Sequence, residues 1–257
     1  MPKAKAATVY ETRPRVVDSM APNGMEIIRF DGWARAAHWA HVLSFFALLV
    51  TGLAIFGPQG DTIARVFGGI QATRLIHRAA AVTFMALSIV LLLISAANNR
   101  FRNIFQGLKN LLAFDKDDLA FLNEFPKKFF GLEARVPEQG KFNGGQKINS
   151  ILVVFGSIVL AATGLVLWNP KAFPIYLVRL AYPLHDGAMF IMFALVLGHM
   201  YLSLVHPITR KALGAMWHGR MSGEYAEHYH AKWYRAAVEK TALEKTDTAK
   251  SGKTTSV

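Results

Sequence analysis

Two histidines stand in a stretch of sequence that is otherwise almost wholly apolar. Fourteen residues separate His185 from His199 in the segment LHDGAMFIMFALVLGHM, residues 184–200. On an α-helix this spacing corresponds to a rise of about 21 Å and a rotation about 40° short of four turns, so both imidazoles lie on one face. Neutral imidazole is a good metal ligand. The segment therefore predicts two candidate ligand positions at two depths of one apolar helix.

The apolar residues of the chain gather in four segments, at roughly 36–57, 76–97, 148–168 and 181–206. Each segment is long enough to cross a bilayer as an α-helix. Because 53% of the 257 residues are hydrophobic and only 18% are charged, a polytopic membrane protein fits better than a soluble domain. The first segment begins too late to be a removable signal peptide. The sequence therefore predicts an all-α, polytopic four-helix membrane bundle over residues 29–206.

Two polar ends flank this bundle, and a long loop interrupts it. Residues 1–28 are polar and basic without periodicity, and we expect them to form a flexible arm. The 98–147 loop contains two amphipathic stretches, IFQGLKNLLAF and LAFLNEFPKKFF, which are typical of helices that lie along a membrane surface. Residues 207–257 form a polar tail, and we expect its end to be disordered.

Lysine and arginine are distributed unevenly along the chain, which has a net charge of +12. Of the 29 basic residues, 6 lie in residues 1–35, 9 in the 98–147 loop and 9 in the 207–257 tail. This is the positive-inside pattern of membrane proteins, so both termini and the loop are predicted to be cytoplasmic. Insertion in a lipid bilayer therefore explains the net positive charge, and no nucleic-acid partner is needed to explain it.

The predicted topology groups four histidines into two pairs at matched depths. His38, at the start of the first span, and His199, late in the fourth, lie toward the cytoplasm. His77 and His185, at the starts of the second and fourth spans, lie toward the outer face. A haem iron takes one imidazole from each side, and helix bundles build such sites from facing helices. A single membrane histidine could be a simple interhelical contact, but two depth-matched pairs favour ligation.

Several positions stay open on spacing alone. His41 lies one turn after His38 and is its rival as a ligand. His228 and His230, in EHYHAKWY, could bind a metal, but a solvated surface segment is the favoured interpretation. Small residues beside the proposed ligands would let a flat macrocycle pack against the helix backbone, although glycines in membrane helices usually just allow two helices to pack closely. These small residues are Gly52, Gly164, Gly187 and Gly198.

The chain contains no cysteine, which excludes disulfides, cysteine-ligated iron–sulfur clusters and covalent haem attachment within it. Any redox cofactor must be held by histidine or methionine, or without a covalent link. A faint internal echo joins TGLAIF at 51–56 to TGLVLW at 163–168, at the ends of the first and third spans. A duplicated helical hairpin is one interpretation, although matches this short are common in apolar sequence.

Six motifs follow one another along residues 28–235: RAAHW, TRLIH, GKFNGGQK, LHDGA, LGHMYLS and EHYHAKWY. In order and spacing, they resemble the cytochrome b (gamma) subunit of respiratory formate dehydrogenase. The resemblance implies two b-type haems between four helices in the bacterial inner membrane. It implies that His38 and His199 are the axial ligands of the inner haem iron, and His77 and His185 those of the outer haem iron.

The same resemblance implies an electron-transfer subunit with no catalytic residues of its own. A molybdenum or tungsten catalytic (alpha) subunit would oxidise formate, and an iron–sulfur (beta) subunit would pass electrons to the outer haem. They would continue through the inner haem to a quinone, either menaquinone or ubiquinone. The family's quinone pocket falls here on Asn143, Gly145 and Gln146, with Gly144 where alanine is common. By itself, however, FNGGQK is an ordinary turn and helix start.

Two other functions stay open at the level of sequence. Related dihaem cytochromes b serve hydrogenases and other molybdoenzymes, so the motifs define the haems better than the electron donor. A haem-free membrane anchor or transporter would also account for four apolar helices. The paired histidines favour a cytochrome over this second alternative.

Overall fold

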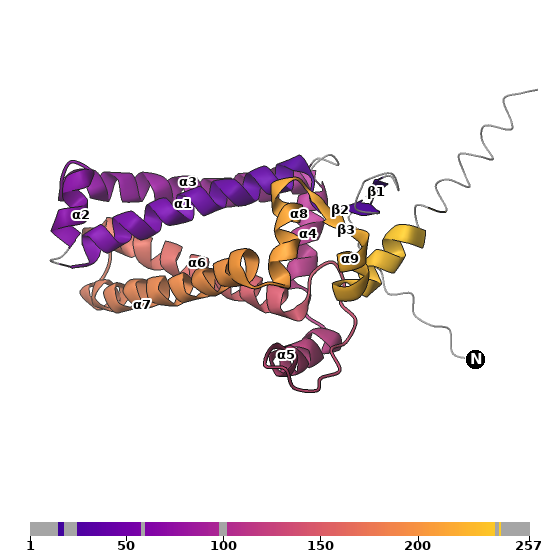
Figure 1. Cartoon of the computed structure of the whole chain (residues 1–257). Coiled ribbons are helices and arrows are strands. Elements are labelled where there is room, and N and C mark those ends of the chain that lie inside the picture. Colours follow the sequence, from indigo (N-terminus) through magenta and orange to yellow (C-terminus); the bar gives the residue numbers. More distant parts are fainter. Residues whose placement is uncertain (1–14, 18–24, 58–59, 98–101, 240–241, 243–257) are drawn as a thin grey trace, which may run out of the picture. The chain divides into compact units, whose positions relative to one another are not determined.

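The computed structural model describes residues 15–17, 25–57, 60–97, 102–239 and 242 (Figure 1). The chain forms two compact units. We call the first the helical unit, which comprises Gly32–Ile94 and Asn149–Leu213. We call the second the polar unit, which comprises Met1–Asp31, Ser95–Ile148 and Gly214–Val257.

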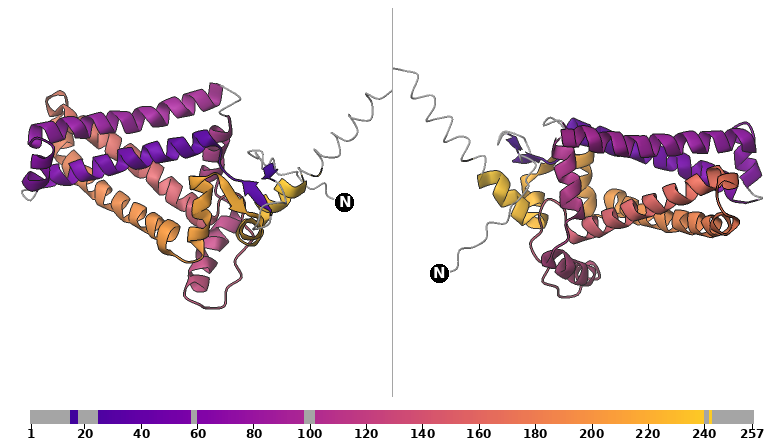
Figure 2. Two further views of the ribbon diagram at one scale, coloured as in Figure 1. Left: turned by 45° about the horizontal axis from the view of Figure 1, so that its top comes forward. Right: turned by 180° about the vertical axis from the view of Figure 1, so that it is seen from behind.

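Long helices dominate the helical unit, where α1 lies beside α3 in every view (Figures 1 and 2). Short 3-10 or π segments η1 (Pro170–Ala172), η2 (Tyr201–Val205) and η3 (Thr209–Ala212) join or extend the helices. The helices are α1 (Gly32–Phe56), α2 (Gly60–Val66), α3 (Ile70–Ala97), α6 (Gly144–Trp168) and α7 (Ile175–Met200).

Four helices of the described residues are long and apolar enough to cross a membrane, namely α1, α3, α6 and α7 with its extension η2. The predicted all-α bundle with four spans is thereby confirmed. Each helix begins a few residues before the predicted segment. Hydropathy misses the polar first turn of α6, GGQK, whereas α7 begins with the apolar residues IYLV ahead of Arg179.

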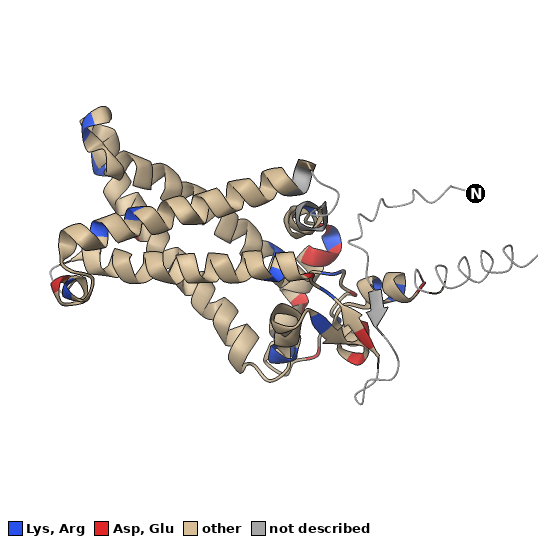
Figure 3. Ribbon diagram, turned by 90° about the horizontal axis from the view of Figure 1, so that it is seen from above, with Lys and Arg blue, Asp and Glu red and all other residues tan. Residues whose placement is uncertain are grey.

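The outward surface of these helices is strongly apolar. Large side chains such as Leu43, Leu75, Phe155 and Ile191 are between 64% and 72% exposed. Most charged residues of these helices lie near the helix ends (Figure 3), although Asp186 follows His185 inside α7. A soluble protein rarely exposes so much contiguous apolar surface, whereas lipid chains require it.

The best-packed part of the helical unit is the end where α1 meets α2 and α7 begins. Its buried residues include Leu49 and Ala54 on α1, Ala64 on α2, and Val178 and Ala181 on α7. Here α2 turns back onto α1 through Gly60, where an added Cβ would lie only 2.1 Å from the carbonyl oxygen of Ala54. A side chain at this position would force the two helices apart, so glycine is required for this packing.

The polar unit contains a three-stranded antiparallel sheet in the order β1-β2-β3. In its register, Glu26 of β2 pairs with Ser222 of β3, which joins residues from opposite ends of the chain. The strands are β1 (Arg15–Val17), β2 (Glu26–Ile28) and β3 (Arg220–Ser222), and the helices are α4 (Arg102–Leu112), α5 (Lys116–Phe129), α8 (Leu213–Trp217) and α9 (Gly223–Tyr229).

This sheet differs from the flexible arm expected for residues 1–28. The short apolar runs RVV and EII are too brief to show strand periodicity, but they pair with each other, and the second pairs with β3. The rest of the arm, and the tail end expected to be disordered, lie outside the described residues. The two amphipathic stretches of the 98–147 loop form helices α4 and α5, as their periodicity predicts.

Helix α5 carries the signals that fix its ends. Asp115 accepts a hydrogen bond from the backbone of Asp118, whose carboxylate accepts one from the backbone of Asp115. This capping box places acidic residues at the positive end of the helix dipole, while Lys127 and Lys128 lie at the other end.

Candidate functional site

Two of the four predicted ligands face each other within the helical unit. His77 lies in the second turn of α3 and His185 lies in α7. Their ring centroids are 6.5 Å apart, and the ring planes form an angle of 68°. An imidazole nitrogen binds a transition metal at about 2 Å, with the ring centre about 1 Å further away, so two rings sharing one metal have centres about 6 Å apart. The observed separation fits one metal between the two rings.

A threonine hydrogen-bonds to each of these imidazoles. Thr51 Oγ1 lies 2.9 Å from Nδ1 of His77, and Thr163 Oγ1 lies 2.9 Å from Nδ1 of His185. Each threonine donates its own proton to the carbonyl four residues earlier, at 2.6 Å for Thr51 and 2.7 Å for Thr163. The hydroxyl oxygens therefore accept from Nδ1–H. This tautomer leaves the Nε2 lone pair as the metal ligand.

A glycine directly follows each threonine and lies against the same imidazole. A Cβ added to Gly52 would lie 3.5 Å from Cε1 of His77, and one added to Gly164 would lie 3.4 Å from Cε1 of His185. The echo between the ends of the first and third spans thus has a structural counterpart, since each Thr-Gly pair supports one histidine. The other two candidate glycines, Gly187 and Gly198, have no such neighbour within 4 Å.

The second predicted pair lies on α1 and α7. The side chains of His38 and His199 lie close enough for a charge on one imidazole to act on the other. Nδ1 of His38 is buried, and it finds no hydrogen-bond partner among the described residues. Two residues after His199 the helix widens into the π-segment η2, a distortion that is frequent at functional sites.

His41, the rival of His38, has different surroundings. Its Nδ1 donates to the carbonyl of Ala37 at 2.8 Å, and its Nε2 lies 2.8 Å from the hydroxyl of Ser88. A neutral imidazole has one donor and one acceptor nitrogen, so these two contacts use both. His38 is therefore the better candidate ligand, a distinction that helix periodicity could not make.

The number of ligating side chains indicates the kind of metal site. No group of three or more His, Cys, Asp or Glu side chains suitable for a metal occurs in the part of the chain that the structure describes. A metal held by protein alone takes three or four such ligands. A haem iron takes four nitrogens from its macrocycle and needs only two axial imidazoles. The facing pair of His77 and His185 fits a haem.

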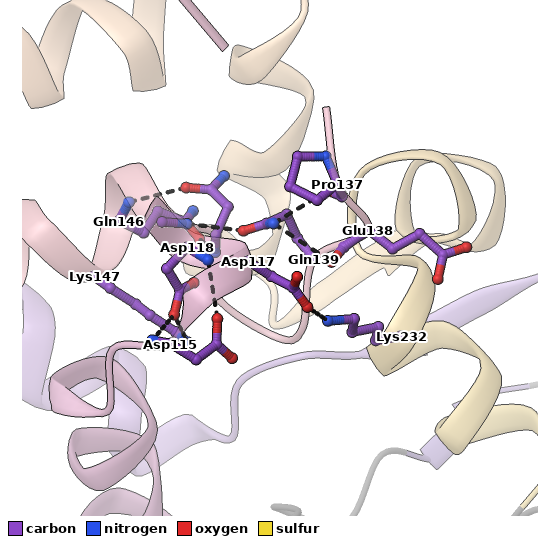
Figure 4. Close-up of polar contacts among 11 residues, drawn as sticks. Asp115, Asp117, Asp118, Pro137, Glu138, Gln139, Gln146, Lys147 and Lys232 are labelled. Carbon is purple, nitrogen blue, oxygen red and sulfur yellow. Dashed lines mark hydrogen bonds and ion pairs between the residues drawn. The ribbon is translucent and has the colours of Figure 1, made fainter. Parts of the chain in front are cut away.

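The motif FNGGQK begins helix α6. Asn143 Oδ1 accepts from the backbone of Gln146 at 2.9 Å, and Gln146 Oε1 accepts from the backbone of Asn143 at 3.1 Å. This is a capping box, so the motif performs the structural role that its turn residues predict (Figure 4). Both carbonyl oxygens accept hydrogen bonds inside the chain, and the amide nitrogen of Asn143 is a donor of the kind that a quinone carbonyl accepts from.

Helix α5 packs closely against this motif. A Cβ on Gly144 would lie 2.5 Å from the carbonyl oxygen of Asp118, so an alanine would not fit here without movement of α5. The carboxylate of Asp118 forms a 2.6 Å ion pair with Lys147, and both side chains are largely buried (Figure 4). Two further ion pairs are exposed to solvent: Lys232 pairs with Asp117, and Arg235 pairs with Glu138.

A buried arginine from the amino-terminal segment hydrogen-bonds to the FNGGQK region and to the carboxyl-terminal segment. The sequence did not indicate these contacts. Arg29 follows strand β2 and is only 4% exposed. Its guanidinium donates to the carbonyl of Lys141 at 2.5 Å, to Oε1 of Gln146 at 3.3 Å and to Nε2 of His230 at 3.2 Å. Burial lowers the pKa of Arg29 to about 10 and, together with the charge of Arg29, that of Lys141 to about 7.

The expected solvated surface segment at His228 and His230 is wrong for His230. This side chain is 1% exposed and donates through Nδ1 to the carbonyl of Gly140 at 2.8 Å. Burial, followed by the charge of Arg29, holds the pKa of His230 well below its ordinary value. His230 is therefore a neutral acceptor for Arg29, whereas His228 is exposed. The burial arises from contacts with residues far away in sequence, which a local motif does not reveal.

Comparison with known proteins agrees with this geometry. The profile of the family described as prokaryotic cytochrome b561 matches residues 29–219, which include all four long helices. The chain is 28% identical over 222 residues to the nitrate-inducible formate dehydrogenase cytochrome b556(Fdn) subunit of Escherichia coli, covering 85% of this chain and 94% of that subunit.

Two further relatives carry similar names. The chain is 26% identical over 219 residues to the formate dehydrogenase cytochrome b556 subunit of Haemophilus influenzae, covering 84% of this chain and 85% of that subunit. It is 26% identical over 224 residues to the formate dehydrogenase cytochrome b556(fdo) subunit of Escherichia coli, covering 86% of this chain and 97% of that subunit. The resemblance drawn from the six motifs is confirmed.

Proposed function

The chain belongs to the prokaryotic cytochrome b561 family, and on this premise we propose that it is the membrane cytochrome b subunit of a formate dehydrogenase. In this role it passes electrons from an iron–sulfur subunit through two b-type haems to the quinone pool. The names of its relatives support formate as the electron source. The formate-oxidising site belongs to a separate molybdenum or tungsten subunit.

The observation that carries the proposal is the facing pair of His77 and His185. Their Nδ1–H tautomer leaves both Nε2 lone pairs available to iron. The two Thr-Gly pairs fix the rings, because each threonine binds Nδ1 and each glycine packs against the same ring. His38 and His199 would hold the second haem, without a hydrogen-bond partner for Nδ1 of His38 among the described residues. When bound, haem supplies reversible one-electron carriage by iron within the apolar part of the membrane.

The balance of electrons and protons defines what the chain has to connect. Oxidation of formate to carbon dioxide releases two electrons and one proton, and reduction of quinone to quinol consumes two electrons and two protons. We assign the chain to the inner membrane with both termini in the cytoplasm, because Lys and Arg concentrate in those segments. The iron–sulfur subunit then docks on the outer side, near the His77–His185 pair, and the quinone binds toward the cytoplasm.

Asn143, Gly145 and Gln146 form the quinone pocket in this proposal. The capping box fixes both amide side chains, and Arg29 holds Oε1 of Gln146 from behind. A Cβ on Gly145 would meet Asn143 Oδ1 at 3.4 Å and Phe121 at 3.5 Å, so glycine leaves open the space between the amide and the aromatic ring. Amide donors beside an aromatic ring suit the carbonyl groups and flat ring of a quinone.

The test is reduction and reoxidation of the cytochrome in the purified complex. Formate added without oxygen should reduce the b-type absorption bands, and a soluble quinone analogue should reoxidise them. A complex whose bands respond to hydrogen and not to formate would assign the chain to a hydrogenase. A chain without haem absorption would overturn the proposal altogether.

A further inference from the structure

The threonine contacts do more than place the rings, because they act on the electronic character of the ligands. Thr51 and Thr163 are 1% and 8% exposed, so water does not compete for their hydroxyl groups. Each hydroxyl donates to a backbone carbonyl and accepts from an imidazole, which makes a short chain of hydrogen bonds. Such chains polarise their members and strengthen the acceptor oxygen.

An acceptor on Nδ1–H raises the basicity of the ligating Nε2. A more basic axial ligand stabilises ferric iron relative to ferrous iron, and hydrogen bonding around a haem is one of the means by which proteins set its potential. We propose that Thr51 and Thr163 lower the reduction potential of the haem held by His77 and His185. This inference rests on the proposed function, since it requires that haem.

The other histidine pair lacks this device on one side. Among the described residues, Nδ1 of His38 finds no acceptor, so its Nε2 stays a weaker base. The haem held by His38 and His199 should therefore have the higher potential of the two. Electron transfer from the His77–His185 site to the His38–His199 site is then downhill, toward the side where the quinone is reduced.

The experiment is a redox titration of both haems in the purified complex carrying Thr51→Val, Thr163→Val or both changes. Valine keeps the shape of threonine and removes the acceptor, so the potential of one haem should shift upward, further in the double variant, while the other stays in place. Thr51→Ser and Thr163→Ser keep the hydroxyl and should restore the original potential. Thr83→Val is the matched control, because Thr83 makes the same bond to a carbonyl, that of Ala79, at 2.9 Å but is exposed on α3.

Two results would overturn the inference. One is an unchanged or lower potential in valine variants that retain both haems. The other is loss of one haem from the single valine variants and its retention in the serine variants, which would show that the hydroxyl only holds the ring. Absence of haem from the unaltered chain would instead refute the proposed function, so the two failures are distinguishable.

Discussion

His38 and His41 carry the same side chain one helical turn apart, yet their neighbours give them different chemistry. Both ring nitrogens of His41 have hydrogen-bond partners, whereas Nδ1 of His38 is buried without one among the described residues. We expect His38→Ala to remove one of two haems and His41→Ala to retain both, as measured by haem content per chain. Loss of haem in the His41 variant, with retention in the His38 variant, would exchange their roles.

Arg29 gives a prediction about stability at the same scale. Arg29→Met removes the guanidinium donor from the carbonyl of Lys141, from Nε2 of His230 and from Oε1 of Gln146, which keeps its bond from the backbone of Asn143. We expect this loss to cost about 2 kcal/mol of unfolding free energy even after the desolvation of the charge is relieved. The control is Arg220→Met, because the 3.3 Å pair of Arg220 with Glu26 is exposed and contributes less than about 1 kcal/mol.

Thermal unfolding of the purified chain measures both arginine variants. Arg29→Met should lower the transition temperature clearly more than Arg220→Met. Equal effects would mean that the buried guanidinium contributes no more to stability than an exposed ion pair.

Individual residues also show where sequence reasoning ends. The four histidines stand out in the sequence as candidate ligands, because imidazoles are rare in apolar helices and the predicted topology assigns their depth. Thr51 and Thr163 could not be, because each contacts a histidine more than twenty residues away on another helix. The repeated Thr-Gly dipeptide was the one available signal, and it showed a likeness between two spans without showing what each span contacts.

At the scale of elements, the start of α6 carries both a structural role and a proposed functional one. Asn143→Ser keeps a hydroxyl that can cap the helix but loses the amide donor, whereas Asn143→Ala loses both and costs about 1 kcal/mol. If the amide binds quinone, both variants should retain haem and its reduction by formate but should slow reoxidation by quinone. Normal reoxidation in the serine variant would reduce the role of Asn143 to helix capping.

The elements were unequally predictable for a physical reason. The long spans follow from local hydropathy, so their number and order could be derived from the sequence. The sheet and the buried position of His230 depend on contacts between the two ends of the chain, such as Ile27 with Met221, and each strand has only three residues. Non-local pairing of such short segments leaves no periodic signal.

At the scale of the whole molecule, we predict the orientation in the membrane from the distribution of charge. Reporter fusions after residue 115 and at the carboxyl terminus should report the cytoplasm, whereas fusions near Gly60 or Lys171 should report the outside. The reason is the concentration of Lys and Arg in residues 1–35, 98–147 and 207–257. The opposite pattern would exchange the sides of the two histidine pairs and would put the proposed docking and quinone sites on the wrong faces.

The central claim is that two histidine pairs hold two haems, and its most direct test is the haem content of the purified chain. The account predicts close to two non-covalent b haems per chain. It also predicts close to one in His185→Ala, which breaks the pair at 6.5 Å, and close to one in His199→Ala. A content near one in the unaltered chain, or an unchanged content in either variant, would contradict it.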